Sequence, residues 1–90
     1  MARFDALTSE FNDAAAAQGS SPDSLFELGL LYCAGRDVPA DLVTAHKWFN
    51  IAAMRGSEDA RRYRTEISSE MSRIEIAKAQ RLAREWLTRH

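Results

Sequence analysis

Few side chains in this sequence of 90 residues belong to the types that carry out chemistry. Cys33 is the single cysteine, and His46 and His90 are the only histidines. Neither histidine has carboxylates or Cys33 at the spacing typical of metal ligands. Cys33 lies in the most apolar stretch of the chain, where burial is expected to raise the pKa of its thiol and to oppose nucleophilic use. We therefore expect no catalytic residue, no metal site and no cofactor, and hence no enzyme.

Charge and glycine placement disfavour the binding of nucleotides and nucleic acids. The four glycines are scattered along the chain and form no phosphate-binding loop. The formal net charge is −1 and the pI is near 6.1, so no general positive field exists to attract phosphates. One local alternative stays open. A basic face could contact an acidic partner or phosphate, and its members would be Arg61, Arg62, Arg64, Arg81, Arg84 and Arg89.

The composition is that of one globular domain. Apolar residues make up 46% of the chain and charged residues 28%, which lies outside the range of disordered proteins. The N-terminal residues lack the apolar run of a signal peptide, and nowhere do about 18 apolar residues follow one another. A single cysteine is typical of a reducing compartment. We expect a cytoplasmic protein without a membrane span.

Apolar residues recur with the helical period in five segments, and the alternation typical of strands is absent. The first predicted helix covers about residues 3 to 18. Four further helices are expected to begin after the capping residues Ser21, Asp41, Ser57 and Ser72. Gly35 and Gly56 are expected to end two of them.

Two groups of side chains lie off the main apolar stripes of these helices. In the fourth predicted helix the stripe passes through Tyr63 and Ile67, so the arginines at 61, 62 and 64 are expected to point outward. In the third predicted helix three apolar residues lie away from the stripe that contains Trp48. They either pack on a flanking unit or are exposed, and they are Val43, Ile51 and Met54.

The sequence repeats itself with an offset of 37 residues, from position 19 to position 56. This alignment places Phe11 opposite Trp48, and the alanine pair at 15 and 16 opposite the pair at 52 and 53. A unit of two helices is therefore repeated. Within residues 24 to 60 the fixed positions of the unit are Leu28, Gly29, Tyr32, Gly35, Val38, Asp41, Ala45, Trp48, Ala52, Ala53 and Gly56.

These residues and spacings resemble the Sel-one-like repeat family, a branch of the tetratricopeptide-like helical repeats. The resemblance implies structural roles for them, with small residues allowing close helix approach and with Tyr32 and Trp48 filling space between turns. One departure is Asp37, which stands where the family has a second glycine. We expect the loop to survive because aspartate tolerates a positive φ better than most residues.

The resemblance implies an all-α fold, a short α-α superhelix of about five antiparallel helices in one domain spanning residues 1–90. Residues 1–19 would resemble the second helix of a degenerate repeat, 22–56 would form a full repeat, and 57–90 would form a degenerate C-terminal capping repeat. The last stretch looks like the closing helix that ends many bacterial members of the family. We therefore expect the chain to be complete.

In superhelices of this family, non-motif positions on the first helix of each unit contact ligands. By that resemblance the candidate partner contacts are Glu27, Leu30, Leu31 and Ala34. We expect a non-catalytic adaptor that holds a peptide or helix of another protein in a shallow groove. Two alternatives stay open. One is a small homo-oligomeric regulatory protein that contacts nucleic acid or an acidic partner through the arginine face. The other is a homodimer formed through Phe4, Leu7 and Phe11.

Overall fold

The computed structural model describes residues 21–35 and 37–89. These residues contain four α-helices and no strand: α2 (Pro22–Ala34), α3 (Leu42–Met54), α4 (Glu58–Ser68) and α5 (Arg73–Arg89). Periodicity and capping signals thus predicted the last four helices correctly. The helix expected over residues 3 to 18, and with it the possible homodimer contact, lies outside the described residues. No helix in the described part of the chain is long and apolar enough to cross a membrane.

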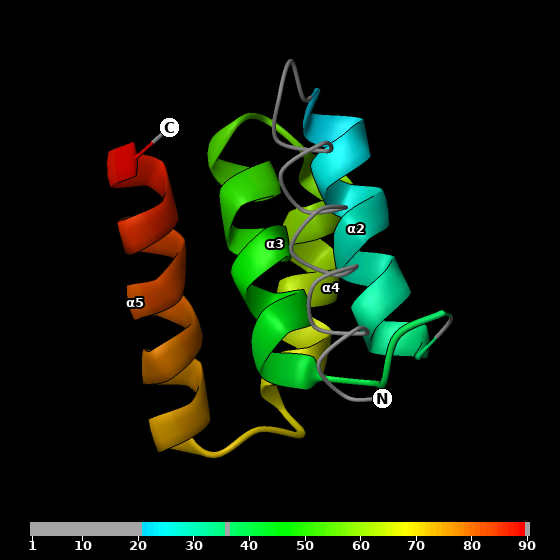
Figure 1. The fold of residues 1–90 in the computed structure, drawn as a ribbon, viewed down its shortest axis with the longest axis vertical. Coiled ribbons are helices and arrows are strands. Elements are labelled where there is room, and N and C mark those ends of the chain that lie inside the picture. The colour runs from blue at the N-terminus through cyan, green and yellow to red at the C-terminus, as the bar shows by residue number, and fades with distance from the viewer. Residues whose placement is uncertain (1–20, 36, 90) are drawn as a thin grey trace.

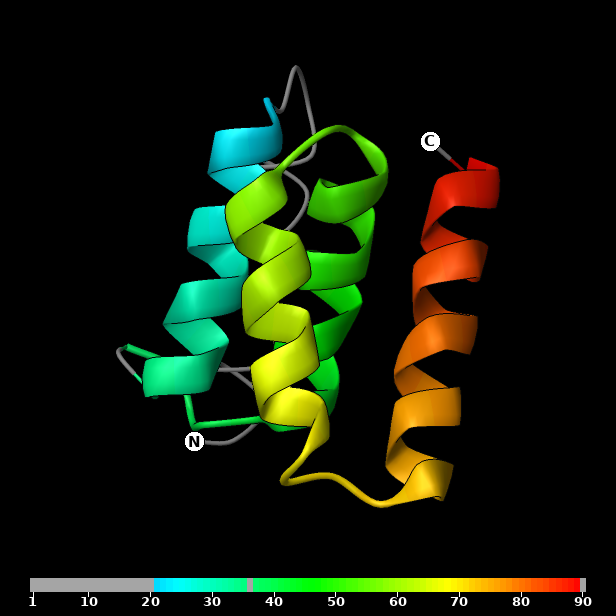
Figure 2. The same cartoon turned by 180° about the vertical axis from the view of Figure 1, so that it is seen from behind.

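The central element is α3, which packs against each of the other three helices. Consecutive helices run in opposite directions, with α2 and α4 on one side of α3 and α5 on the other (Figures 1 and 2). Because α3 has neighbours on several sides, most of its circumference is buried, including Trp48, Phe49 and Ile51. Of the three off-stripe residues, Ile51 is therefore core, Val43 is half-buried and Met54 is 70% exposed.

The helix starts carry the caps that the sequence predicts. Three capping side chains each accept a hydrogen bond at 3.1 Å from the backbone N–H three positions later, and they belong to Ser21, Asp41 and Ser57. At the start of α5, the Ser72 N–H donates to Glu75 Oε1 at 2.8 Å while the Glu75 N–H donates to Ser72 Oγ at 3.1 Å. Each cap provides a hydrogen-bond acceptor for N–H groups that have no partner within the helix. Each such cap stabilises the folded protein by about 1 kcal/mol.

The loop between α2 and α3 uses two left-handed residues. Gly35 has φ of 73° and its N–H donates to the Leu31 carbonyl at 3.0 Å, which ends α2. Asp37 has φ of 63°, so this aspartate adopts the left-handed conformation expected of it. Val38 is buried and the Asp41 N–H donates to the Tyr32 carbonyl at 3.0 Å. The loop is thereby held against the end of α2.

A close contact between α2 and α3 depends on Gly29. A Cβ atom at this position would lie 2.4 Å from Cε1 of Phe49, well inside van der Waals contact. Phe49 is fully buried and its ring occupies the space that a side chain at position 29 would need. The small residue thus sets how closely the two helices approach.

Candidate functional site

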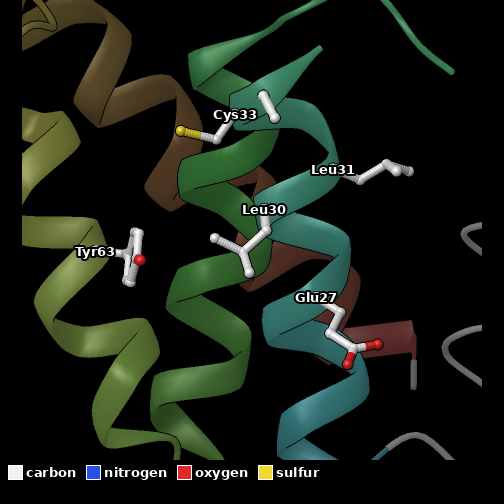
Figure 3. A pocket seen from close by; sticks show the side chains of 6 residues that line it. Glu27, Leu30, Leu31, Cys33 and Tyr63 are labelled. Carbon is white, nitrogen blue, oxygen red and sulfur yellow. The ribbon is translucent and has the colours of Figure 1, made fainter. Parts of the chain in front are cut away.

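An open groove of about 500 Å³ lies along the outer face of α2. The four residues expected to contact a partner all line it, together with Cys33 of α2 and one residue of α4, and the complete set is Glu27, Leu30, Leu31, Cys33, Ala34 and Tyr63 (Figure 3). Most of these side chains are apolar. The arrangement offers an apolar surface that a partner could cover, and the Glu27 carboxylate is the one charged group among its lining side chains.

Helical spacing explains why α2 presents this face. Positions 27, 30, 31 and 34 are separated by three or four residues, so they share one side of the helix. The opposite side carries Leu25, Leu28 and Tyr32, which are buried in the core. Because α2 is apolar around nearly its whole circumference, burying one side leaves apolar residues on the other. In the described part of the chain, no helix covers that second side completely.

Tyr63 forms the wall of the groove on α4 and is held there by other aromatic rings. Its ring centroid lies 5.3 Å from that of Phe26, edge to face, and 5.8 Å from that of Phe49. Phe26 and Phe49 are themselves 5.8 Å apart. Three aromatic side chains from α2, α3 and α4 therefore pack together and fix the ring, while Tyr63 stays 38% exposed.

The groove side chains differ in direction. Figure 3 shows Leu30 and Cys33 on the side of α2 that faces Tyr63, whereas Leu31 and Glu27 point away from Tyr63. Leu30 and Cys33 thus form an apolar strip between the two helices, and Leu31 widens it over the outer face of α2.

Cys33 contributes to the groove as an apolar surface. It is an unpaired thiol and only half-buried, although the sequence placed it in the most apolar helix. Burial raises the pKa of the Cys33 thiol, and the negative charge of Glu70 raises it further. The thiol pKa thus shifts in the direction expected from the sequence. A protonated thiol is a weak nucleophile, so this position is suited to contact more than to reaction.

A buried polar network joins α3 to α4. His46 is 1% exposed, and its Nε2 lies 2.9 Å from Ser68 Oγ, while its Nδ1 lies 3.0 Å from Nδ2 of Asn50. Ser68 Oγ donates to the Arg64 carbonyl at 2.7 Å, so it must accept from Nε2–H. Nδ1 then accepts from the Asn50 amide, and Asn50 Oδ1 accepts from Arg64 Nη1 at 2.8 Å. The network therefore holds His46 neutral, with its proton on Nε2.

This network leaves His46 no role toward an external ligand. Both ring nitrogens are engaged by protein groups, and burial lowers the pKa of His46, with the charge of Arg64 lowering it further. Among residues 21–35 and 37–89, no three histidine, cysteine or acidic side chains gather where they could hold a metal ion.

The arginines expected to form a basic face are divided between α4 and α5, which lie on different sides of α3 (Figures 1 and 2). Three of them pair with carboxylates on their own helix: Arg62 with Asp59, Arg61 with Glu58 at 4.0 Å, and Arg81 with Glu85 at 3.8 Å. The outward position expected for Arg64 is wrong. This side chain is half-buried because its guanidinium reaches inward to Asn50.

Two groove residues were missed by sequence reasoning as contact positions. Helical periodicity places Tyr63 on the packing stripe of its helix, and the apolar stretch around Cys33 predicts a buried thiol. Both side chains lie at the boundary between the buried core and the exposed surface. Helical periodicity alone does not locate this boundary. Comparison of the chain with protein-family models, curated proteins and solved structures gave no match in any of the three.

Proposed function

We propose that this chain is a non-catalytic protein-interaction module that holds a helix or extended segment of a partner in the α2 groove. The supporting observation is that Glu27, Leu30, Leu31 and Ala34 line one open, mainly apolar groove with Cys33 and Tyr63. An open strip with few polar groups suits side chains of a peptide better than a small polar substrate, which needs convergent hydrogen-bonding groups. Its limited size favours affinities of about micromolar or weaker.

The repeat architecture is part of this proposal. We propose that the chain is a short Sel-one-like superhelix in which residues 22–56 form the full repeat and 57–90 the capping repeat. The burial and backbone conformation of several motif residues support this proposal. Tyr32, Ala45 and Trp48 are buried, and the glycines at 35 and 56 both have positive φ. A cytoplasmic location is proposed on the free thiol of Cys33.

The groove can be tested with Ala34→Glu. Ala34 is exposed, so the added carboxylate fills the groove without removing a core side chain. Peptides would be selected on wild-type protein from a displayed random library, and their affinities measured for each variant. We expect Ala34→Glu to weaken binding at least about tenfold, since burying an unpaired charge costs more than about 1.4 kcal/mol.

The matched control is Met54→Glu, which adds the same charge at an exposed apolar residue outside the groove. This variant should bind selected peptides as wild type does. The amide shifts that a peptide causes in the nuclear magnetic resonance spectrum should centre on residues 27 to 34 and on Tyr63. Peptides that bind both variants equally, or that shift residues elsewhere, would contradict the groove as the site.

A further inference from the structure

The outer face of α5 is a second surface with its own chemistry. Ile74 is 81% exposed and lies beside three cationic side chains over a shallow depression of about 460 Å³, lined by Ile74, Ala77, Lys78, Arg81 and Arg84. The other face of α5 packs on α3 through Ala79 and Ala83. A helix face with an exposed isoleucine flanked by cations has the chemistry to dock into an apolar groove with acidic margins.

The groove on α2 has margins of the opposite charge. Glu27 lines it, and α2 contains no lysine or arginine. On α4 and just beyond it, Glu66 and Glu70 follow Tyr63 by three and seven residues, and Glu70 is close enough to Cys33 to raise the thiol pKa. No ion pair joins Glu27, Glu66 or Glu70 to a cation within residues 21–35 and 37–89. These carboxylates are available to a cationic partner.

The two surfaces match in pattern as well as in charge. On α5, Ile74, Lys78 and Arg81 are separated by four and three residues, so they form one stripe. Laid along the groove, Ile74 would contact the apolar strip at Leu30, and the cations would reach the carboxylates on either margin. The Arg81 and Glu85 pair is exposed at 3.8 Å and therefore weak, so Arg81 can change partners.

We propose that the α2 groove binds the outer face of α5 from a second copy of this chain, so that copies associate head to tail. This proposal rests on the proposed function of the groove and adds its occupant. The groove and α5 lie on opposite sides of α3 (Figures 1 and 2), so one copy cannot fill its own groove with its own α5. The contact joins two different surfaces, which produces rings or open chains of copies.

The test is sedimentation velocity of the full chain over a range of concentrations, with two charge reversals at exposed residues. Wild type should form species larger than a monomer as concentration rises. It should associate less when salt is raised to roughly 0.3 M, where exposed charges are strongly screened. Glu27→Lys and Lys78→Glu should each weaken association about tenfold or more, because each replaces an attraction by a repulsion.

Mixing the two variants provides the decisive control. The lysine introduced at position 27 in the groove of the Glu27→Lys variant would face the glutamate introduced at position 78 on α5 of the Lys78→Glu variant, which is an attraction. Glu27 in the unchanged groove of the Lys78→Glu variant would likewise attract Lys78 on the unchanged α5 of the Glu27→Lys variant. An equimolar mixture should therefore associate like wild type although each variant alone does not, and a variant that failed to fold could not be rescued in this way. Circular dichroism would confirm unchanged helix content.

Three outcomes would overturn the proposal: monomer at every concentration and low salt, association that neither charge reversal changes, or a mixture that stays monomeric. The second would place the contact on another surface. None of these outcomes affects the proposed function, because the selected peptides test the groove separately through Ala34→Glu. If selected peptides bound wild type and Ala34→Glu equally while head-to-tail association stayed intact, only the proposal that the groove binds other proteins would be contradicted.

Discussion

Nε2 of His46, in the middle of α3, lies 2.9 Å from Oγ of Ser68 at the end of α4. The contact joins two helices through a buried neutral imidazole, because the Ser68 hydroxyl donates its hydrogen bond to the Arg64 carbonyl and therefore accepts one from His46. Protonation of Nδ1 would set an N–H against the Asn50 amide donor. Turning the amide would then set its NH₂ group against the Arg64 guanidinium. The neutral form is thus favoured by hydrogen bonding as well as by burial.

Stability should therefore fall on mild acidification. The pKa of His46 in the fold is lowered from 6.5, so between that value and the folded pKa the unfolded chain binds a proton that the folded chain does not. The free energy of unfolding is expected to decrease as pH falls below 6.5 and to level off below the folded pKa. Urea unfolding at a series of pH values on both sides of 6.5 measures this decrease in the free energy of unfolding. His46→Gln should lose most of this dependence, and an unchanged slope in that variant would contradict the assignment.

Gly29→Ala should destabilise the fold although alanine favours helices. The added Cβ would lie 2.4 Å from Phe49 Cε1, so the buried ring must move and the free energy of unfolding should fall by about 1–3 kcal/mol. Chemical denaturation measures the loss. In the background of Phe49→Leu, which removes the ring, the same substitution should cost much less. Additive effects of the two substitutions would show that the clash is not the cause.

Trp86→Ala should loosen α5 selectively. The Trp86 ring packs edge to face against the fully buried Trp48 at 5.4 Å, and the Arg55 guanidinium lies 5.3 Å from its centroid. We expect a loss of about 2–3 kcal/mol, because Trp86 is half-buried and a buried tryptophan costs more. Amide hydrogen exchange should accelerate in α5 more than in α2. Equal acceleration in both helices would mean that α5 is not a separately stabilised element.

Cys33 should react slowly with iodoacetamide at neutral pH, with a rate that rises as pH increases. Burial and the charge of Glu70 raise the thiol pKa, which lowers the fraction of reactive thiolate. Glu70→Gln removes the charge while keeping a similar shape, so alkylation should become faster at the same pH. The control is Glu66→Gln, which removes the neighbouring charge that does not raise the pKa of Cys33. Equal rates in wild type and Glu70→Gln would contradict the electrostatic effect.

Helix positions and ends were predictable because their causes are local. A capping serine or aspartate acts on the N–H three positions later, and the reciprocal bonds between Ser72 and Glu75 form within a single turn. The left-handed conformation of Asp37 could likewise be expected from one residue type in one loop. The outer face of α2 also follows from spacing alone, since positions 27, 30, 31 and 34 must share a side.

Sequence patterns were enough to predict which of the described segments are helical, where each begins and which residues share a face. Tertiary structure alone decided that α3 is central, which buries Ile51, draws Arg64 inward to Asn50 and brings Tyr63 beside Cys33 at the groove. The physical reason is that helix formation depends on contacts within about four residues, whereas these placements depend on packing between side chains of different helices.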